Sequence, residues 1–264
     1  MYDAIAALHR HLDGIVWALL PGTCILCNAP SGVMADLCEP CRAALPWLPR
    51  PCHRCASPLP DGAEQPCADC RTRSPPFTRT VAAFIYTGPI IRMAHRLKFN
   101  GSRVDARVIG AQLASCVLGQ YPPRATPDLV VPVPLSRERL LRRGHNQAAL
   151  LARWVASGVG IPVDYHACIR IRHAPPQTGL SRHARLRNLA DAFCISRPLP
   201  AQTVAIVDDV MTTGSTVTAL TRALLDAGAA EVHVWAAART PPPGWPCAIH
   251  PVSVGTERPA RELE

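Results

Sequence analysis

The run of residues 204–216 constrains the fold of this chain more than any other stretch. It starts with the apolar residues 204–207, mostly β-branched, which predict a strand buried on both faces, as in a parallel sheet. Asp208 and Asp209 follow at the carboxyl end of that strand, where open α/β sheets bind their ligands. A glycine loop rich in hydroxyl groups then leads into a predicted helix over residues 217–227, whose N-terminus favours an anion. This order predicts a site for a sugar phosphate.

The glycine loop supplies the groups that would hold the phosphate. Its backbone N–H groups and hydroxyls are expected to point at the anion, while Asp208 and Asp209 hold hydroxyl groups of the ligand. A strand, an acidic turn and a helix cap without a ligand form the alternative, which is less favoured because capping needs only one hydroxyl residue. The run resembles the signature of the type I phosphoribosyltransferases. In that signature the acidic pair binds the ribose 2- and 3-hydroxyls, and the loop wraps the 5-phosphate of 5-phosphoribosyl-1-pyrophosphate (PRPP). The loop residues are Thr212, Thr213, Gly214, Ser215 and Thr216.

Eight of the 12 cysteines form four C-x2-C pairs within the first 70 residues. Such a pair places two thiolates on one side of a tight turn, and two pairs complete a tetrahedral zinc site. The spacers inside the two halves have 10 and 11 residues, which favours two sequential ribbons; the gap between the halves also has 10, so an interleaved pairing stays open. Disulfides or unliganded thiols are the less favoured alternative. Four thiolates leave no open position, so the two Zn²⁺ ions are expected to be structural. The eight predicted ligands are Cys24, Cys27, Cys38, Cys41, Cys52, Cys55, Cys67 and Cys70.

The length of 264 residues favours two units, and the cysteine pairs end shortly before the composition changes near Phe77. We therefore predict a double zinc ribbon over residues 1–76 and a second domain over residues 77–264, with a disordered tail. The formal net charge of +9 favours an anionic partner. No stretch of 18 uncharged apolar residues occurs, which predicts a cytoplasmic protein without membrane insertion.

The second domain alternates apolar runs with helical patterns. This alternation predicts a parallel sheet covered by helices on both faces. Strands are predicted at residues 81–86, 129–134, 163–171, 204–207 and 232–237, with a possible edge strand at 249–254. Helices are predicted at residues 90–99, 104–118, 150–159 and 217–227.

Two further polar clusters follow predicted strands. In the first, Arg143 suits the oxygens of a pyrophosphate and Gly144 lets the backbone approach a ligand closely. The alternative there is an exposed helix start with solvated arginines. The second cluster, residues 172–193, predicts a mobile loop that closes over the ligand, or else a solvated basic face. In the interpretation of the first cluster as an exposed helix start, the solvated arginines are Arg137, Arg139 and Arg142.

Taken in order, these segments resemble the ComF family. The resemblance rests on the cysteine pairs, the Leu97-Lys98-Phe99 segment, the run of residues 143–147, the pattern of Gln177, Arg185, Asn188 and Phe193, and the loop of residues 208–216. It implies an α/β fold, with the Rossmann-like parallel sheet of a type I phosphoribosyltransferase behind an N-terminal double zinc ribbon. It also implies PRPP as ligand, with Mg²⁺ carried on the pyrophosphate. Single-stranded DNA and DNA-uptake proteins of natural transformation, such as a competence helicase, are the implied partners.

The resemblance also assigns roles to single residues. Asp208, Asp209 and Arg143 are expected at the reacting ribose and pyrophosphate. The substrate-binding residues are expected to be the loop together with Lys98, Gly144, Asn146, Gln147, Gln177 and Arg185. Thr212 stands where purine-salvage enzymes carry an aspartate, so transfer to hypoxanthine or guanine is not expected. Two functions stay open: a PRPP-binding protein that handles DNA, and an active phosphoribosyltransferase with an unknown acceptor.

Overall fold

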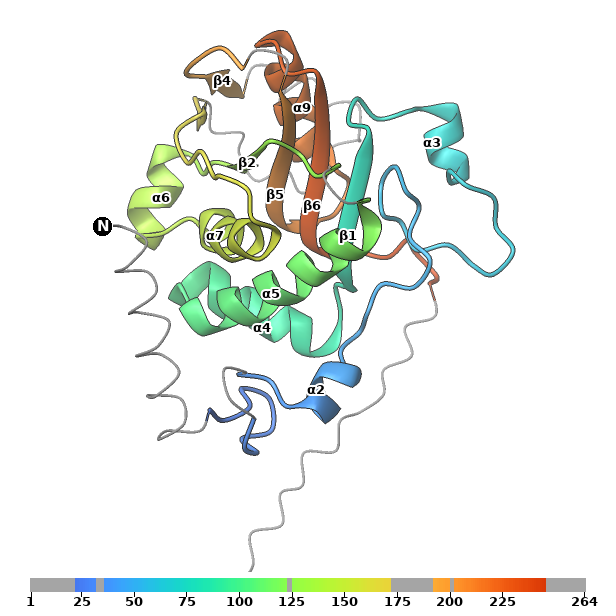
Figure 1. Cartoon of the computed structure of the whole chain (residues 1–264), viewed down its shortest axis with the longest axis vertical. Coiled ribbons are helices and arrows are strands. Elements are labelled where there is room, and N and C mark those ends of the chain that lie inside the picture. Colours follow the sequence, from blue (N-terminus) through green and yellow to red (C-terminus); the bar gives the residue numbers. More distant parts are fainter. Residues whose placement is uncertain (1–21, 32–35, 123–124, 172–191, 200–201, 246–264) are drawn as a thin grey trace, which may run out of the picture. The chain divides into compact units, whose positions relative to one another are not determined.

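The computed structural model describes residues 22–31, 36–122, 125–171, 192–199 and 202–245 (Figure 1). The chain divides into two compact units: residues 1–45 with 246–264, and residues 46–245. In the first unit the described residues hold the first two cysteine pairs and the short helix α2 (Glu39–Ala43). The second unit holds the other two pairs, helix α3 (Ala68–Thr72) and the sheet. The domain boundary between residues 76 and 77 stays a prediction.

A four-stranded parallel sheet forms the core of the second unit, as predicted. Its order is β1-β6-β5-β2, and Figure 1 shows β1, β6 and β5 side by side. Continuous runs of buried apolar residues make these strands, because helices cover both faces of the sheet. The strands are β1 (Arg79–Ile85), β2 (Leu129–Pro132), β5 (Thr203–Met211) and β6 (Glu231–Arg239).

Strand β5 is longer than the apolar run predicts. It continues through the acidic pair to Met211, with Asp208 opposite Ala236 and Met211 opposite Arg239 on β6. The expectation that the strand ends before the carboxylates was wrong, because backbone pairing with β6 extends the strand whatever its side chains are. The loop therefore begins at Thr212, and the carboxylates lie on a rigid element.

Alternate residues of the strands face different helices. Val204 and Ile206 belong to the core cluster that includes Val217 and Leu220 of α9 (Ser215–Asp226). On the other face, Trp235 donates its Nε1–H to Tyr121 Oη, 3.1 Å away, just after α5. Helices therefore cover both faces. The other helices are α4 (Gly88–Asn100), α5 (Arg103–Gln120), α6 (Arg137–Arg143) and α7 (Gln147–Val159).

Helices α5 and α7 approach closely because two glycines lie at their contact. A Cβ added at Gly110 would lie 2.5 Å from the Cβ of Trp154, and one at Gly158 would lie 2.7 Å from the Cβ of Ala114. No helix in the described part of the chain has the length and apolar character needed to cross a membrane.

The predicted strand 163–171 is only partly present. Cys168–Arg170 forms β3, which pairs antiparallel with β4 (Phe193–Ile195) in a separate two-stranded sheet. The apolar pattern did not distinguish this small sheet from the parallel one. Residues 172–191 of the predicted mobile loop, and the possible edge strand at 249–254, lie outside the described residues; the end of that cluster, Phe193, begins β4.

Short segments with prolines pair with both edge strands of the parallel sheet. Beside β1, Leu48 N–H donates to Ala83 C=O at 2.9 Å and Pro46 C=O accepts from Ile85 N–H at 2.8 Å. Beside β2, Pro162 C=O accepts from the N–H of Val130, also at 2.9 Å. Neither edge of the sheet is therefore bare.

The second ribbon is hydrogen-bonded to the sheet within the same unit. The N–H of Thr80 on β1 donates to His53 C=O at 3.0 Å, and its hydroxyl donates to Arg54 C=O at 2.6 Å. Thr80 is fully buried, so these bonds satisfy groups that water cannot reach. The ribbon of residues 52–70 is therefore a fixed part of this unit.

Candidate functional site

Two clusters of four cysteine sulfurs form, one in each unit. In each, all four Sγ atoms lie within 4.8 Å of one another. The Sγ atoms of Cys27 and Cys38 are 3.6 Å apart, and those of Cys55 and Cys67 are 3.7 Å apart. A tetrahedral zinc ion with bonds of about 2.3 Å sets its sulfurs about 3.8 Å apart, whereas a disulfide needs about 2 Å. The sequential pairing is confirmed, and the two clusters fit two structural zinc ions.

The electrostatics of the thiols also fit a dication. The side chain of Cys55 hydrogen-bonds to Cys52 and lowers the pKa of Cys52 to about 4, against the effect of burial. The same contact raises the pKa of Cys55. Burial raises the pKa of Cys70 to about 12. Ionisation of Cys52 thus opposes the ionisation of Cys55 and Cys70, and a bound cation removes that opposition.

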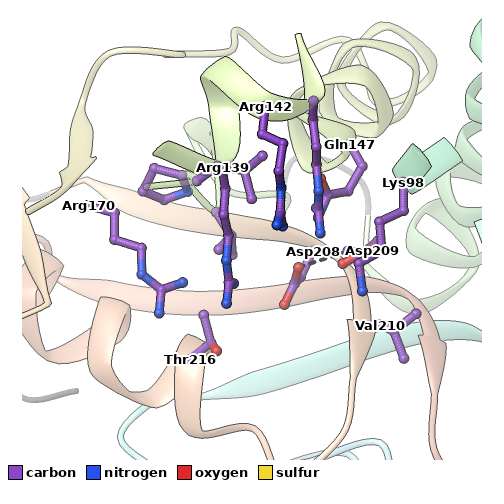
Figure 2. A pocket seen from close by; sticks show the side chains of 13 residues that line it. Lys98, Arg139, Arg142, Gln147, Arg170, Asp208, Asp209, Val210 and Thr216 are labelled. Atoms are coloured by element: carbon purple, nitrogen blue, oxygen red, sulfur yellow. Dashed lines mark hydrogen bonds between the residues drawn. The ribbon is translucent and has the colours of Figure 1, made fainter. Parts of the chain in front are cut away.

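A cavity of about 270 Å³ opens beside the acidic pair, beyond the carboxyl end of β2 (Figure 2). Figure 2 shows Arg139, Arg142 and Lys98 reaching toward Asp208 and Asp209. Five cationic side chains and two carboxylates line it, so the cavity favours an anionic ligand. The lining residues are Lys98, Val133, Pro134, Leu135, Arg139, Arg142, Arg143, Gln147, Arg170, Asp208, Asp209, Val210 and Thr216.

The two carboxylates differ in their surroundings. Burial, and then the neighbouring charge of Asp209, raises the pKa of Asp208 well above its usual value. The Asp208 carboxylate accepts the N–H of Asp209 at 2.9 Å. Arg170 acts on Asp208, and Asp209 acts on Arg143, through longer-range charge interactions. Among the described residues, no arginine or lysine lies within ion-pair distance of either carboxylate, so neither charge is neutralised by direct contact.

The glycine loop presents unused donors. In the part of the chain that is described, the N–H groups of Thr212, Thr213 and Gly214 donate to no protein acceptor. Gly214 has φ +75°, and a Cβ there would lie 2.8 Å from the terminal methyl of Met211. Helix α9 starts at the next residue. Unused N–H groups before a helix N-terminus are the usual elements of an anion site.

The loop separates the first cavity from a second. Thr216 lines the first, whereas Thr212, Thr213 and Gly214 line a neighbouring cavity of about 600 Å³. Ser215 lines neither cavity, and its hydroxyl lies 2.7 Å from that of Thr213. The second cavity extends to the second ribbon at Cys55 and Cys70. The predicted loop residues therefore do not all face one space.

The segment after β2 joins several predicted residues. The ring nitrogens of His145 lie 2.8 Å from the carbonyl oxygens of Leu97 and Arg143, which fixes the end of α4, and with it Lys98, beside α6. Asn146 donates to Val133 C=O at 3.0 Å and caps α7 rather than lining the cavity.

Arg143 at the end of α6 and Gln147 at the start of α7 both lie in the cavity wall. Gly144 ends that helix with φ +71°, and it lines neither cavity. Arg143 donates to Gln147 Oε1 at 3.2 Å, while its buried Nε has no partner among the residues that the structure describes. Burial, and then Arg139, lowers the pKa of Arg143. The described residues therefore satisfy this guanidinium only in part. Of the other arginines of this cluster, Arg139 and Arg142 line the cavity and Arg137 does not.

Arg170 is a lining residue that the sequence analysis missed. It lies on β3, and burial lowers its pKa. Its guanidinium lies 5.5 Å from the ring centre of Phe193, and its buried Nε has no partner in the described part of the chain. The signal was the pattern Cys168-Ile169-Arg170, because alternation places the arginine on the same face as the buried cysteine. Gln177 and Arg185 lie outside the described residues.

The chain is similar in sequence to known proteins over most of its length. The double zinc ribbon domain family matches residues 15–71. The chain is 37% identical to the DNA utilization protein YhgH of Salmonella typhi over 84% of this chain and 98% of that protein. It is 32% identical to competence protein F of Haemophilus influenzae over 82% of this chain and 96% of that protein. A solved purine phosphoribosyltransferase of Pyrococcus horikoshii is similar at 16% identity and a TM-score of 0.30, over 59% of this chain and 74% of that one. Because the sequence relatives match at these identities over most of both chains, this protein belongs to the ComF family.

Proposed function

We propose that the protein binds PRPP with Mg²⁺ at the acidic pair and the glycine loop, and that this binding serves the handling of DNA. The observation that carries the proposal is the set of N–H groups at Thr212, Thr213 and Gly214 that donate to no acceptor among the described residues. They follow the end of the strand that carries both carboxylates. An anion and a set of hydroxyl groups are the two chemistries that this order of groups suits.

Each part of PRPP has a complementary group. The carboxylates of Asp208 and Asp209 would accept the ribose hydroxyls. The loop and the N-terminus of α9 would hold the 5-phosphate. The pyrophosphate would face the cations of the first cavity, above all Arg143, whose Nε has no partner among the described residues. Mg²⁺ takes carboxylate and phosphate oxygens, and when bound it would neutralise charge on the pyrophosphate.

The same groups would support phosphoribosyl transfer as a second candidate function. In a dissociative displacement at ribose C1, the carboxylates hold the ribose and Arg143 stabilises the departing pyrophosphate. A transferase also needs a side chain that takes a proton from the second substrate, the one that receives the phosphoribosyl group. Asp208 and Asp209 are the only acidic residues among the described residues that line the first cavity, and both are assigned to the ribose. This favours binding without nucleobase transfer.

The link to DNA rests on the relatives and on charge. The printed names of the relatives are DNA utilization protein and competence protein F. The formal net charge of +9 supports contact with a polyanion such as single-stranded DNA. Such a role implies proteins of DNA uptake as partners, a competence helicase among them. It also implies that the protein acts in the cytoplasm.

Calorimetric titration of the zinc-loaded protein with PRPP and Mg²⁺ tests the ligand. Pyrophosphate release with candidate acceptors then separates a transferase from a binding protein. Asp226→Ala, a change of an exposed carboxylate at the far end of α9, is the matched control for changes at Asp208. Absence of PRPP binding to the wild-type protein would overturn the proposal.

A further inference from the structure

Arg239 joins the glycine loop to the second ribbon. It is the last residue of β6 and pairs in register with Met211, the last residue of β5. Its Nη1 donates to Met211 C=O at 2.9 Å, to Thr240 C=O at 3.1 Å and to the carbonyl of Thr212. Its Nε donates to Cys55 C=O at 3.0 Å. One guanidinium therefore contacts the start of the loop and a predicted zinc ligand.

These bonds decide which way the loop donors point. In a trans peptide the C=O and N–H bonds point in opposite directions. Because the carbonyls of Met211 and Thr212 point at Arg239, the N–H groups of Thr212 and Thr213 point away from it. Both N–H groups lack an acceptor in the described part of the chain. Arg239 thus holds two peptides in the orientation that leaves their donors available to an anion.

The other end of the guanidinium is held by the ribbon. Cys55 is one of the four clustered thiols of residues 52–70, and its carbonyl is fixed when those thiols share a zinc ion. The ribbon is also bonded to β1 through Thr80. The guanidinium of Arg239 therefore donates to the Cys55 carbonyl, which the ribbon holds in place, and to the carbonyls of Met211 and Thr212 at the start of the loop.

We propose that Arg239 is a positioning residue for the 5-phosphate of the ligand, and that the zinc-loaded second ribbon supports it. The inference rests on the proposed function, since it concerns the same loop. It assigns the second zinc ion a role in ligand affinity. By linkage, a ligand on the loop stabilises the zinc site by the same factor as zinc stabilises ligand binding.

The test compares Arg239→Gln, Arg239→Lys and Arg222→Gln in full-length zinc-loaded protein. Arg222 is an exposed arginine on α9 that lines the same second cavity, so its change removes an equal charge near the loop. Three probes are titrated: PRPP, ribose 5-phosphate and inorganic pyrophosphate, each with Mg²⁺. Zinc content and thermal unfolding confirm that each variant is folded and loaded.

We expect Arg239→Gln to weaken binding of PRPP and ribose 5-phosphate by about tenfold or more, from the loss of charge-assisted hydrogen bonds that orient the loop. Pyrophosphate affinity should stay unchanged, because the first-cavity cations hold that group. Arg239→Lys should lose part of the affinity, since one ammonium cannot replace the planar guanidinium, and it serves if the glutamine variant does not fold. Arg222→Gln should leave all three affinities within about twofold, as expected for an exposed charge.

A second readout concerns zinc. PRPP should slow the chelator-driven loss of one of the two zinc ions in the wild-type protein, and this protection should disappear in Arg239→Gln. Equal affinities of Arg239→Gln and the wild type for ribose 5-phosphate would overturn the positioning role while leaving PRPP binding intact. An equal loss for all three probes would also overturn it, because a general structural defect would explain that result. A wild-type protein that binds none of the probes would overturn the proposed function itself.

Discussion

Asp208→Asn should stabilise the ligand-free protein at neutral pH. Burial disfavours the charged form of this carboxyl group, and the adjacent Asp209 disfavours it further. Asparagine keeps the size of the side chain and an oxygen that can accept the N–H of Asp209, as the carboxylate does at 2.9 Å. The change thus removes an unfavourable charge and leaves the local hydrogen bond in place.

The pH dependence gives the size of the effect. The folded-state pKa of Asp208 is raised above its ordinary value of 3.8, so above that value the folded state keeps a proton that the unfolded chain has lost. The free energy of unfolding therefore falls as pH rises through this window and up to the folded pKa. One proton gives a slope of at most about 1.4 kcal/mol per pH unit within this window. The asparagine variant lacks this slope, so its advantage should grow with pH.

Urea unfolding of zinc-loaded wild-type and Asp208→Asn proteins, followed from about pH 5.5 to 8, measures this difference with the thiolate sites still able to hold metal. Asp226→Asn, at an exposed carboxylate, should show no such trend. A stability difference between wild type and Asp208→Asn that does not change with pH, or that favours the wild type, would refute the reasoning.

Three further predictions concern ligand, metal and DNA. Asp208→Ala and Asp209→Ala should each weaken PRPP binding by about 1.5 to 3 kcal/mol, the usual contribution of a hydrogen bond to a charged group, as measured by calorimetry; an unchanged affinity in the double variant contradicts the assignment. Elemental analysis should find two zinc ions in each chain and one in Cys24→Ser or Cys67→Ser, whereas one zinc ion in the wild type would contradict the two closed sites. Binding of single-stranded DNA should weaken linearly on a log-log plot against salt, and saturating PRPP should displace DNA from the first-cavity arginines; affinity that stays flat from about 50 to 200 mM salt would exclude an electrostatic contact.

The parts of the fold that were predictable depend on local pattern. Apolar runs located all four strands of the parallel sheet, because strands buried on both faces are apolar at every position. The C-x2-C spacing located both zinc clusters, because the ligand geometry is set within a few residues. The lengths of the strands were less predictable. Strand β5 extends to Met211 through pairing with β6, and no local property of Asp208 or Asp209 indicates that pairing.

The residues of the candidate site also divide into those that the local sequence predicted and those that it did not. Asp208, Asp209, Arg143, Gln147, Lys98 and Thr216 were expected in one site, and all six line the first cavity. Arg170 was missed although the alternation along its strand places it on the buried face. Arg239 was not expected, because its role depends on contacts between distant parts of the chain. Arg239 contacts Cys55, which is 184 residues away in the sequence. Contacts at such separation follow from the tertiary structure and leave no periodic signal.

The covered edges of the sheet affect the solubility of the protein and determine which shorter fragments of it stay soluble. Exposed strand edges template aggregation, and a proline beside an edge prevents further pairing because it has no N–H to donate. Pro46 and Pro49 flank the segment beside β1, where the ring of Trp47 lies 4.9 Å from that of the fully buried Phe84. A fragment that starts at Phe77, where the composition changes, would lose this cover and expose both Phe84 and the backbone of β1. We expect such a fragment to self-associate, and a fragment that starts at Pro46 to keep its edge protected.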